Sequence, residues 1–236
     1  MAQAGLVVNM VFVDNFNRFV LANLGPLISG LWVTIYVCFW AFLLAVLLGA
    51  VVCFIRLRIP YLRFLAIAYV EFFRATPILV QLLWVNYVWP EVFGFPSTVV
   101  GAGILALALQ SSGYLAETFR AGFEGLPKGQ REAAEAIGIS RWRMICRVEV
   151  PQVALVVAPL VINQLAVVVK SSTLVSVIAI SDLMYAGLKI VNQWYEPIEV
   201  LTAIALAYFV LIFSISGLAN YAYVHFQNKF GLVARR

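Results

Sequence analysis

A cation followed by three hydroxyl groups stands out in an otherwise apolar part of the chain. The run consists of Lys170, Ser171, Ser172 and Thr173. At the end of a helix these groups could receive a carboxylate. A lysine at this position could instead extend its amine to a membrane interface, and the residue types leave both interpretations open.

A charged pair lies in another apolar stretch. Glu71 and Arg74 are three residues apart and therefore share one face of a helix. Each charge costs about 2.5–3.5 kcal/mol at the centre of a bilayer. An internal ion pair that fixes helix packing is therefore favoured over a gate along a pathway. Gln81 lies on nearly the same face as Arg74 and could contact a substrate or hold helices together.

The most polar internal segment is the loop of residues 127–151. Pro127 suits the first turn of a helix, and residues 130–137 contain three alanines, which are strong helix formers with small side chains. Gly138 is expected to end this helix in the left-handed conformation. Ser140 is expected to cap a second helix.

The first of these helices would offer a small-residue surface. Ala133 and Ala134 would let another protein approach closely, and Glu132 would supply a charged anchor point. The alternative is a basic helix at the membrane interface, because several side chains suit lipid headgroups: Arg141, Trp142, Arg143 and Arg147. The two interpretations can apply to different halves of the loop.

The composition indicates a membrane protein. Of the 236 residues, 64% are hydrophobic and 11% are charged, whereas soluble domains have about 45–50% and about 25%. No alternation typical of an outer-membrane barrel is present. We therefore predict an all-α integral membrane protein with five transmembrane helices, at about residues 27–55, 65–89, 98–119, 150–169 and 200–224.

Lysine and arginine residues are distributed unequally between the two sides of these spans. Twelve follow the first, third or fifth span, and three lie on the other side: Arg18, Lys170 and Lys189. Since short cytoplasmic loops carry the excess of positive charge, we predict an N-terminus outside and a C-terminus in the cytoplasm. The loop of residues 127–151 then faces the cytoplasm.

Three segments are not predicted to span. Residues 1–26 mix polar and large apolar side chains, which is typical of an amphipathic helix at the outer interface. Residues 170–197 are too polar for a crossing, so a short membrane-dipping segment and an outer loop are expected there. Residues 226–236 are expected to form a cytoplasmic tail.

Several classes of function are disfavoured. The single histidine, His225, and three cysteines without paired spacing indicate no metal site, and no motif indicates catalytic residues. The chain also lacks a G-x-x-x-x-G-K-[ST] phosphate loop. The basic residues lie between apolar runs, which fits membrane topology better than nucleic-acid binding.

The loop resembles the EAA loop of bacterial ATP-binding-cassette (ABC) importer permeases, which reads E-A-A, three residues, G, nine residues, then I-x-L-P. The matching residues are Glu132, Ala133, Ala134, Gly138 and Pro151, with Val148 and Val150 as conservative replacements. Further motifs are similar to those of the polar amino-acid permeases: EFFRATPILVQ (71–81), GYLAETFRAG (113–122) and KSSTL (170–174). The resemblance covers about residues 27–225.

This resemblance implies a type I ABC importer permease fold and transport of amino acids or close analogues across the bacterial inner membrane. It implies that the chain is not an enzyme and holds no cofactor, and that ATP and Mg are bound by a dimer of separate ATP-binding subunits docked at Glu132, Ala133, Ala134 and Gly138. The other implied partners are a second permease subunit, either the same chain or a paralogue, and an extracytoplasmic solute-binding protein. Gln81, Lys170, Ser171, Ser172 and Thr173 are the candidate pathway or substrate residues.

The alternative is a secondary transporter or channel subunit driven by an ion gradient. Such folds commonly contain inverted repeats. No repeat is evident in this sequence, and five spans do not divide evenly.

Overall fold

The computed structural model describes residue 16 and residues 20–195 and 197–229. This part of the chain is helical and contains no strand, which confirms the all-α prediction. Its elements are α-helices, 3₁₀ helices (η2, η3, η6) and π-helices (η4, η5). In chain order they are η2 (Leu21–Asn23), α2 (Leu24–Arg58), η3 (Pro60–Leu62), α3 (Arg63–Ala75), α4 (Ile78–Leu83), η4 (Trp84–Val88), α5 (Trp89–Phe93), α6 (Val99–Glu124), α7 (Lys128–Ala136), α8 (Arg141–Met144), η5 (Ile145–Glu149), α9 (Val150–Ser171), η6 (Ser172–Ile178), α10 (Leu183–Trp194) and α11 (Pro197–Lys229).

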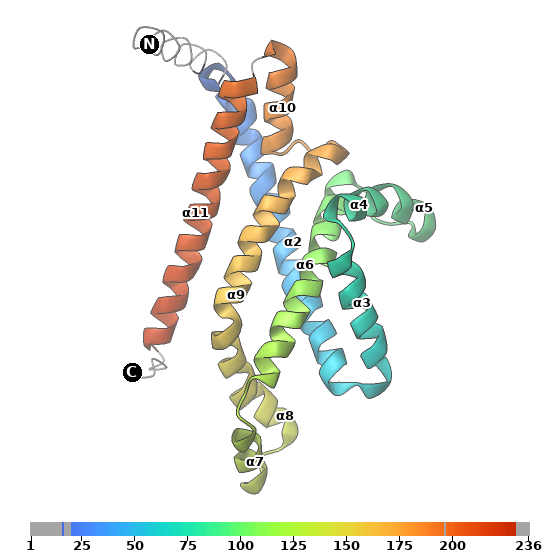
Figure 1. Ribbon diagram of the computed structural model, residues 1–236, viewed down its shortest axis with the longest axis vertical. Coiled ribbons are helices and arrows are strands. Elements are labelled where there is room, and N and C mark those ends of the chain that lie inside the picture. Colours follow the sequence, from blue (N-terminus) through green and yellow to red (C-terminus); the bar gives the residue numbers. More distant parts are fainter. Residues whose placement is uncertain (1–15, 17–19, 196, 230–236) are drawn as a thin grey trace, which may run out of the picture.

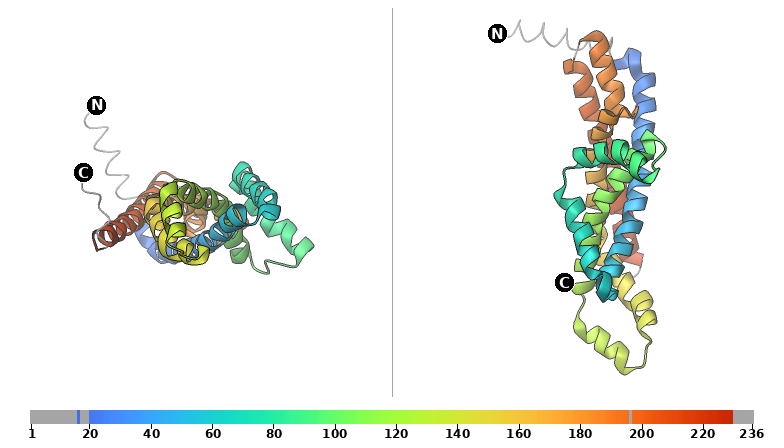
Figure 2. Two further views of the ribbon diagram at one scale, coloured as in Figure 1. Left: turned by 90° about the horizontal axis from the view of Figure 1, so that it is seen from below. Right: turned by 90° about the vertical axis from the view of Figure 1, so that its right-hand side faces the viewer.

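The long helices α2, α6, α9 and α11 run along the long axis of the molecule (Figure 1). Among the described residues, four helical stretches are long and apolar enough to cross a membrane, and a bent helix pair supplies a fifth candidate. The α7–α8 loop extends beyond the ends of α6 and α9, whereas α10 lies at the opposite end (Figures 1 and 2). The fold therefore separates a protruding loop from the body of the bundle.

The second predicted span, residues 65–89, is not one straight helix. Residues Pro60–Ala75 and Ile78–Phe93 meet at an angle of 107°. Thr76 and Pro77 are extended between them, with ψ angles of 133° and 136°. Proline has no N–H for the helix ladder and disfavours helical geometry at the preceding residue, so the apolar run continues through a bend.

Small residues bring α2 and α6 into close contact. Ala41, Ala45 and Gly49 recur every fourth residue of α2 and are buried. A Cβ atom added at Gly49 would lie 2.9 Å from Cβ of Leu115 and 3.2 Å from the backbone nitrogen of Ala116. Such spacing of small residues permits close backbone approach in membranes, so these two helices form the central pair of the bundle.

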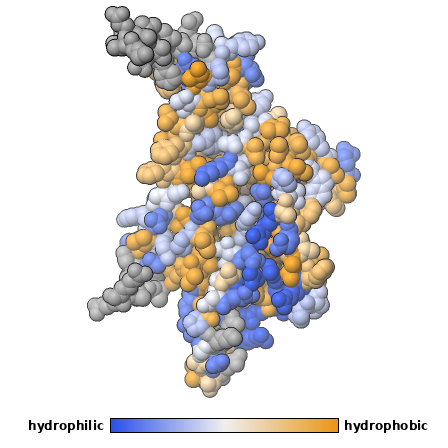
Figure 3. Space-filling model, viewed as in Figure 1, coloured by the Kyte–Doolittle hydropathy of each residue, from blue (hydrophilic) through white to orange (hydrophobic). Residues whose placement is uncertain are grey.

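Most of the remaining surface is apolar. On the face drawn in Figure 3, hydrophobic residues form large patches, and hydrophilic residues gather mainly in the middle and lower part of the view. Large side chains such as Trp32, Phe64 and Phe213 are exposed. A contiguous apolar surface of this extent indicates contact with lipid or with other subunits.

The segments predicted not to span have mixed outcomes. Most of the predicted N-terminal interfacial helix (1–26) lies outside the described residues, as do residues 230–236 of the predicted tail. Helix α11 extends to Lys229, so the described start of that tail is helical. Within residues 170–197, the described part is mostly helical rather than a loop, because η6 and α10 occupy it.

Helix α10 is held against the bundle by a buried carboxylate. Asp182 caps α10 by accepting a hydrogen bond from the backbone N–H of Tyr185 (2.9 Å) and accepts another from the hydroxyl of Tyr208 in α11 (3.2 Å). The hydroxyl of Thr34 in α2 accepts from the backbone N–H of Leu183 (3.1 Å). These bonds connect three helices at the end opposite the α7–α8 loop.

Candidate functional site

The protruding loop has the geometry that its sequence predicts at Gly138. This residue follows α7 with φ of +74°, and the N–H of Ile139 donates to the carbonyl of Ala134 (3.0 Å). This six-residue closure with a left-handed residue is a Schellman motif, which favours glycine. The predicted left-handed stop is therefore confirmed. Ser140 precedes α8 in an extended conformation, but its side chain makes no capping hydrogen bond.

The motif residues of α7 divide between two faces. Ala134 is buried at 5% exposure, and α7 contacts α8. Glu132, Ala133 and Ala136 are exposed, and their spacing of three and four residues places them on one side of the helix. Ala134 thus packs α7 against its own loop. Ala133 and Ala136 form an exposed surface, and the carboxylate of Glu132 lies on the same side of the helix.

Ion pairs connect the base of this loop to the bundle. Glu149, at the end of η5, is 2% exposed and accepts a hydrogen bond from Arg58 of α2 at 3.1 Å. This pair is a direct charged link between the returning end of the loop and the first long helix. Because Glu149 is buried, its carboxylate depends on this partner more than an exposed carboxylate would.

A second group of ion pairs lies beside the first. Arg56 of α2 donates to Glu117 of α6 at 2.6 Å. Arg120 also bonds Glu117, and it bonds Glu124 one turn further along α6. The ends of α2 and α6 are therefore joined where the loop begins. Sequence reasoning missed both groups; the spacing of three and four residues among the three α6 members was the available signal.

The predicted pair of Glu71 and Arg74 is weak in geometry. Its closest nitrogen and oxygen atoms are 3.9 Å apart, and the side chains are 65% and 35% exposed. Arg74 instead packs on α6, with its guanidinium carbon 5.3 Å from the ring centre of Tyr114. A Cβ atom at Gly113 would lie 3.2 Å from Cγ of Arg74, so the glycine makes room for the arginine.

Gln81 is fully buried at the bend between α3 and α4. Its amide nitrogen donates to the carbonyls of Phe73 (2.9 Å) and Thr76 (3.0 Å). These are carbonyls that the break in the helix releases from the regular ladder. Of the two interpretations that the sequence left open, these contacts favour a bracing role, with the amide oxygen of Gln81 buried and without a described partner.

The hydroxyl run lies where α9 passes into η6. Lys170 is exposed, Ser171 is half-buried and Ser172 is buried. The hydroxyls of Ser172 and Thr173 donate to backbone carbonyls three residues earlier, at 2.8 Å each. Their oxygens can still accept further hydrogen bonds.

Gln81 and the hydroxyl run of residues 170–173 lie on neighbouring elements, whereas the α7–α8 loop is distant from both. Elements α4 and η6 contact each other, so the helix of Gln81 and the segment of Ser172 and Thr173 are neighbours. The α7–α8 loop lies at the far end of the bundle from both (Figure 1). The candidate pathway residues and the candidate docking surface therefore form separate sites. In the described residues, no three histidine, cysteine, aspartate or glutamate side chains gather as metal ligands.

Comparison with known proteins assigns this architecture to a known group. Residues 41–229 match the family described as "Binding-protein-dependent transport system inner membrane component". The arginine transport system permease protein ArtQ of Bacillus subtilis is 31% identical over 188 residues, which cover 79% of this chain and 85% of that protein. A probable amino-acid ABC transporter permease, y4tG of Sinorhizobium fredii, is 31% identical over 214 residues, covering 89% and 91% of the two chains.

A solved structure agrees with these relatives. A chain from the crystal structure of an amino acid ABC transporter with histidines superimposes with a TM-score of 0.77 at 34% identity. The superposition covers 85% of this chain and 94% of that chain. The match therefore extends over the bundle and is not limited to the loop.

Proposed function

Because the chain belongs to the family of binding-protein-dependent transport system inner membrane components, we propose that it is the membrane-spanning permease subunit of an ABC importer for amino acids or close analogues. It is a multi-pass inner-membrane protein and a transport subunit. The observation that carries the amino-acid assignment is the match to amino-acid permeases at about one-third identity along most of their length. These similarities support an ABC importer and give no support to an ion-gradient-driven transporter.

The energy source is proposed to be a separate pair of ATP-binding subunits. The chain lacks the phosphate-binding loop that would hold a nucleotide, so ATP and Mg would bind to those partners. The exposed face of α7, with Glu132, Ala133 and Ala136, is the proposed docking surface, and Gly138 fixes where that helix ends. Ala134 is buried and would position this surface without touching the partner.

The ion pairs at the base of the loop suit a mechanical role. When ATP binding draws the two ATP-binding subunits together, α7 would move with them. Arg58–Glu149 and Arg56–Glu117 would pass this movement to α2 and α6. Two permease subunits, identical or paralogous, would then rock between outward and inward access as rigid bodies.

The orientation and the substrate route complete the proposal. The excess of lysine and arginine supports a proposed orientation with the α7–α8 loop in the cytoplasm and α10 outside, where a solute-binding protein would deliver the substrate. Lys170, Ser171, Ser172 and Thr173 are proposed to meet the carboxylate of that substrate. Gln81 is proposed to contribute through α4, which contacts the hydroxyl-bearing segment.

Docking can be tested by co-purification of the permease with its cognate ATP-binding subunit. Replacing Glu132→Trp together with Gly138→Val should abolish co-purification and ATP-driven uptake. The matched control is Gly129→Ala, since Gly129 lies on the same helix with open space around it and an ordinary backbone φ. Unimpaired docking in the double variant would refute the assignment of this surface.

The energy source needs a separate reconstitution. Proteoliposomes that contain the permease alone should accumulate no amino acid, and addition of the ATP-binding subunit, the binding protein and ATP should produce uptake. Accumulation by the permease alone under an ion gradient would overturn the proposal and favour the secondary transporter.

A further inference from the structure

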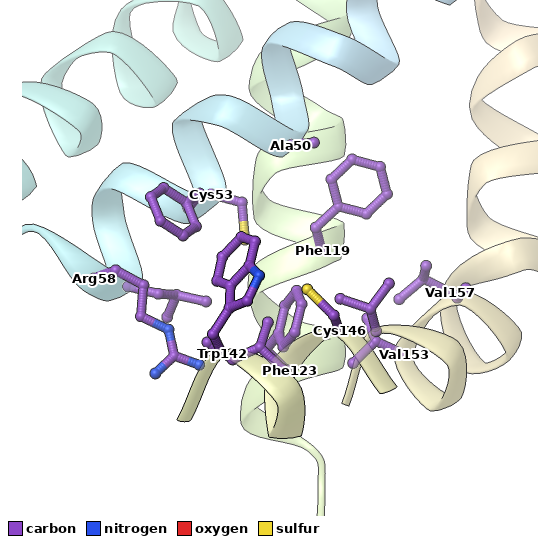
Figure 4. A pocket seen from close by; sticks show the side chains of 14 residues that line it. Ala50, Cys53, Arg58, Phe119, Phe123, Trp142, Cys146, Val153 and Val157 are labelled. Carbon is purple, nitrogen blue, oxygen red and sulfur yellow. The ribbon is translucent and has the colours of Figure 1, made fainter. Parts of the chain in front are cut away.

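An apolar cavity of about 330 Å³ lies where the loop returns to the bundle. The last turns of α2, the end of α6 and the segment from α8 into α9 form its walls (Figure 4). Its lining is almost entirely apolar and includes Phe54, Phe119, Phe123, Trp142 and Val157. Neither the docking surface on α7 nor the candidate pathway residues use this cavity.

The depth of the cavity matches part of a membrane leaflet. On α2 its lining extends from Ala50 to Arg58, which corresponds to roughly 12 Å along a helix axis. One leaflet contributes about half of the 30 Å hydrocarbon thickness. Since Arg58 follows the apolar part of α2, the cavity begins at the membrane boundary and extends into the hydrocarbon.

Basic residues flank the cavity-lining Trp142 in sequence. Arg58 lines the cavity and is neutralised by Glu149. Trp142, which is 65% exposed, lies between Arg141 and Arg143 in sequence. Both of these arginines are exposed, as is Arg147, and none of the three forms an ion pair with another described residue. These three charges without a described ion-pair partner are therefore all cationic, and two of them flank the cavity-lining Trp142 in sequence.

We propose that this cavity binds one acyl chain of an anionic phospholipid, with the lipid phosphate held by Arg141 and Arg143. An apolar slot beside uncompensated arginines is complementary to a molecule that has an apolar tail and an anionic head. Trp142 suits the boundary between the two, because tryptophan combines an apolar ring with a polar N–H. The lipid would thereby contact α2, α6 and the base of the α7–α8 loop at once.

Fluorescence quenching of Trp142 tests this directly. The permease is reconstituted in vesicles of phosphatidylcholine that contain either brominated phosphatidylglycerol or brominated phosphatidylcholine at equal fractions. The contribution of Trp142 is obtained by subtracting the signal of Trp142→Phe, which removes one of the six tryptophans. We expect brominated phosphatidylglycerol to quench Trp142 at several-fold lower mole fraction than brominated phosphatidylcholine.

Two sets of variants separate the proposed phosphate site at Arg141 and Arg143, here called the head site, from the apolar cavity that would hold the acyl chain, here called the tail site. Arg141→Gln with Arg143→Gln should remove the preference for phosphatidylglycerol, because each basic residue near an anionic surface strengthens binding by roughly fivefold. Ala50→Phe with Ala154→Phe should fill the cavity from its exposed side and reduce quenching by both lipids. The controls are Lys189→Gln and Ala205→Phe, which change exposed residues away from the cavity and should leave quenching unchanged.

The outcomes are distinct. Equal quenching by both lipids in the unaltered protein would refute the anionic head site. Quenching that the filling variant leaves unchanged, with its melting temperature preserved, would refute the tail site. If the filling variant unfolds, the double glutamine variant still decides the proposal, since its substitutions are on the surface. Protection of Trp142 from both lipids would show that a protein subunit covers the cavity, and would also overturn the proposal.

Discussion

The buried ion pair between Arg58 and Glu149 allows a quantitative test of how the loop is anchored. Removal of Arg58 would take a hydrogen-bonded cation away from the Glu149 carboxylate, which is 2% exposed. Breaking a buried pair in this way costs about 3–5 kcal/mol. Arg58 keeps 19% of its side-chain exposure, so water can partly replace it, and we expect Arg58→Ala to lower the free energy of unfolding by about 2 kcal/mol.

This decrease in the free energy of unfolding can be measured as a change in melting temperature. For a chain of this size each kcal/mol corresponds to about 2–4 °C, so Arg58→Ala and Glu149→Ala should each lower the melting temperature by about 4–8 °C. Intrinsic fluorescence of the detergent-solubilised protein reports this transition. The matched control is Glu71→Ala, because Glu71 belongs to a pair that is 3.9 Å apart and 65% exposed at the carboxylate, and its loss should cost less than about 1 kcal/mol.

A double variant distinguishes the ion pair from simple loss of packing. Arg58 lines the cavity together with the apolar residues Leu57 and Ile145, and Glu149 is buried. Arg58→Leu with Glu149→Leu should therefore be more stable than either single alanine variant, since apolar replacement of a whole buried pair is often neutral. Additive losses in the double variant, or an equal loss from Glu71→Ala, would refute the claim that this pair anchors the loop.

Three further predictions concern single positions. Gly138→Ala should weaken binding of the ATP-binding subunit by roughly tenfold in a titration, because the left-handed conformation at φ +74° costs a residue with a side chain about 1–2 kcal/mol; equal affinity would contradict the role of the helix stop. Gln81→Leu should lower the melting temperature by a few degrees, because the carbonyls of Phe73 and Thr76 lose their donor at about 1–3 kcal/mol, and an unchanged temperature would exclude the bracing role. Gly187→Ala should be destabilising, since its Cβ would overlap Cδ1 of Ile204 and lie 2.9 Å from Cγ1 of the same buried residue. Gly217→Ala has open space and should be neutral or slightly stabilising in the same melting assay.

The sequence predicted the features that depend on composition or on local conformation. The apolar runs predicted helices because crossing a membrane requires internally satisfied backbone groups, and the described chain is helical throughout its long segments. Gly138 was predictable because a left-handed helix end selects glycine through its own backbone. In both cases the cause lies within a few residues of the effect.

Some of the features that the sequence analysis missed depend on contacts between residues that are distant in sequence. Another, the bend of the second span, occurs inside an apolar run that hydropathy alone does not divide. Arg58 and Glu149 are 91 positions apart, and Arg56 and Glu117 are 61 apart, so nothing local identifies either pair. The bend at Thr76 and Pro77 had a local signal, but hydropathy continues across it and concealed the break. Ala134 matched the loop motif as well as Ala133 did, yet only the fold distinguishes the buried alanine from the exposed one.

The same contacts constrain how the α7–α8 loop can move. Its departing end continues from α6 beyond Glu124, and its returning end holds Glu149. The returning end is tied to Arg58 of α2 through Glu149, and the body of α6 is tied to Arg56 of α2 through Glu117. A displacement of α7 that swings the returning end away from α2 would break the Arg58–Glu149 pair.

The lower-energy response is a movement of α2 and α6 together with the loop, and their close packing through Ala41, Ala45 and Gly49 resists sliding between them. The pull of a docked partner would thus rotate this helix pair as one body. The bend between α3 and α4 is braced by Gln81 and lies outside this pair of helices.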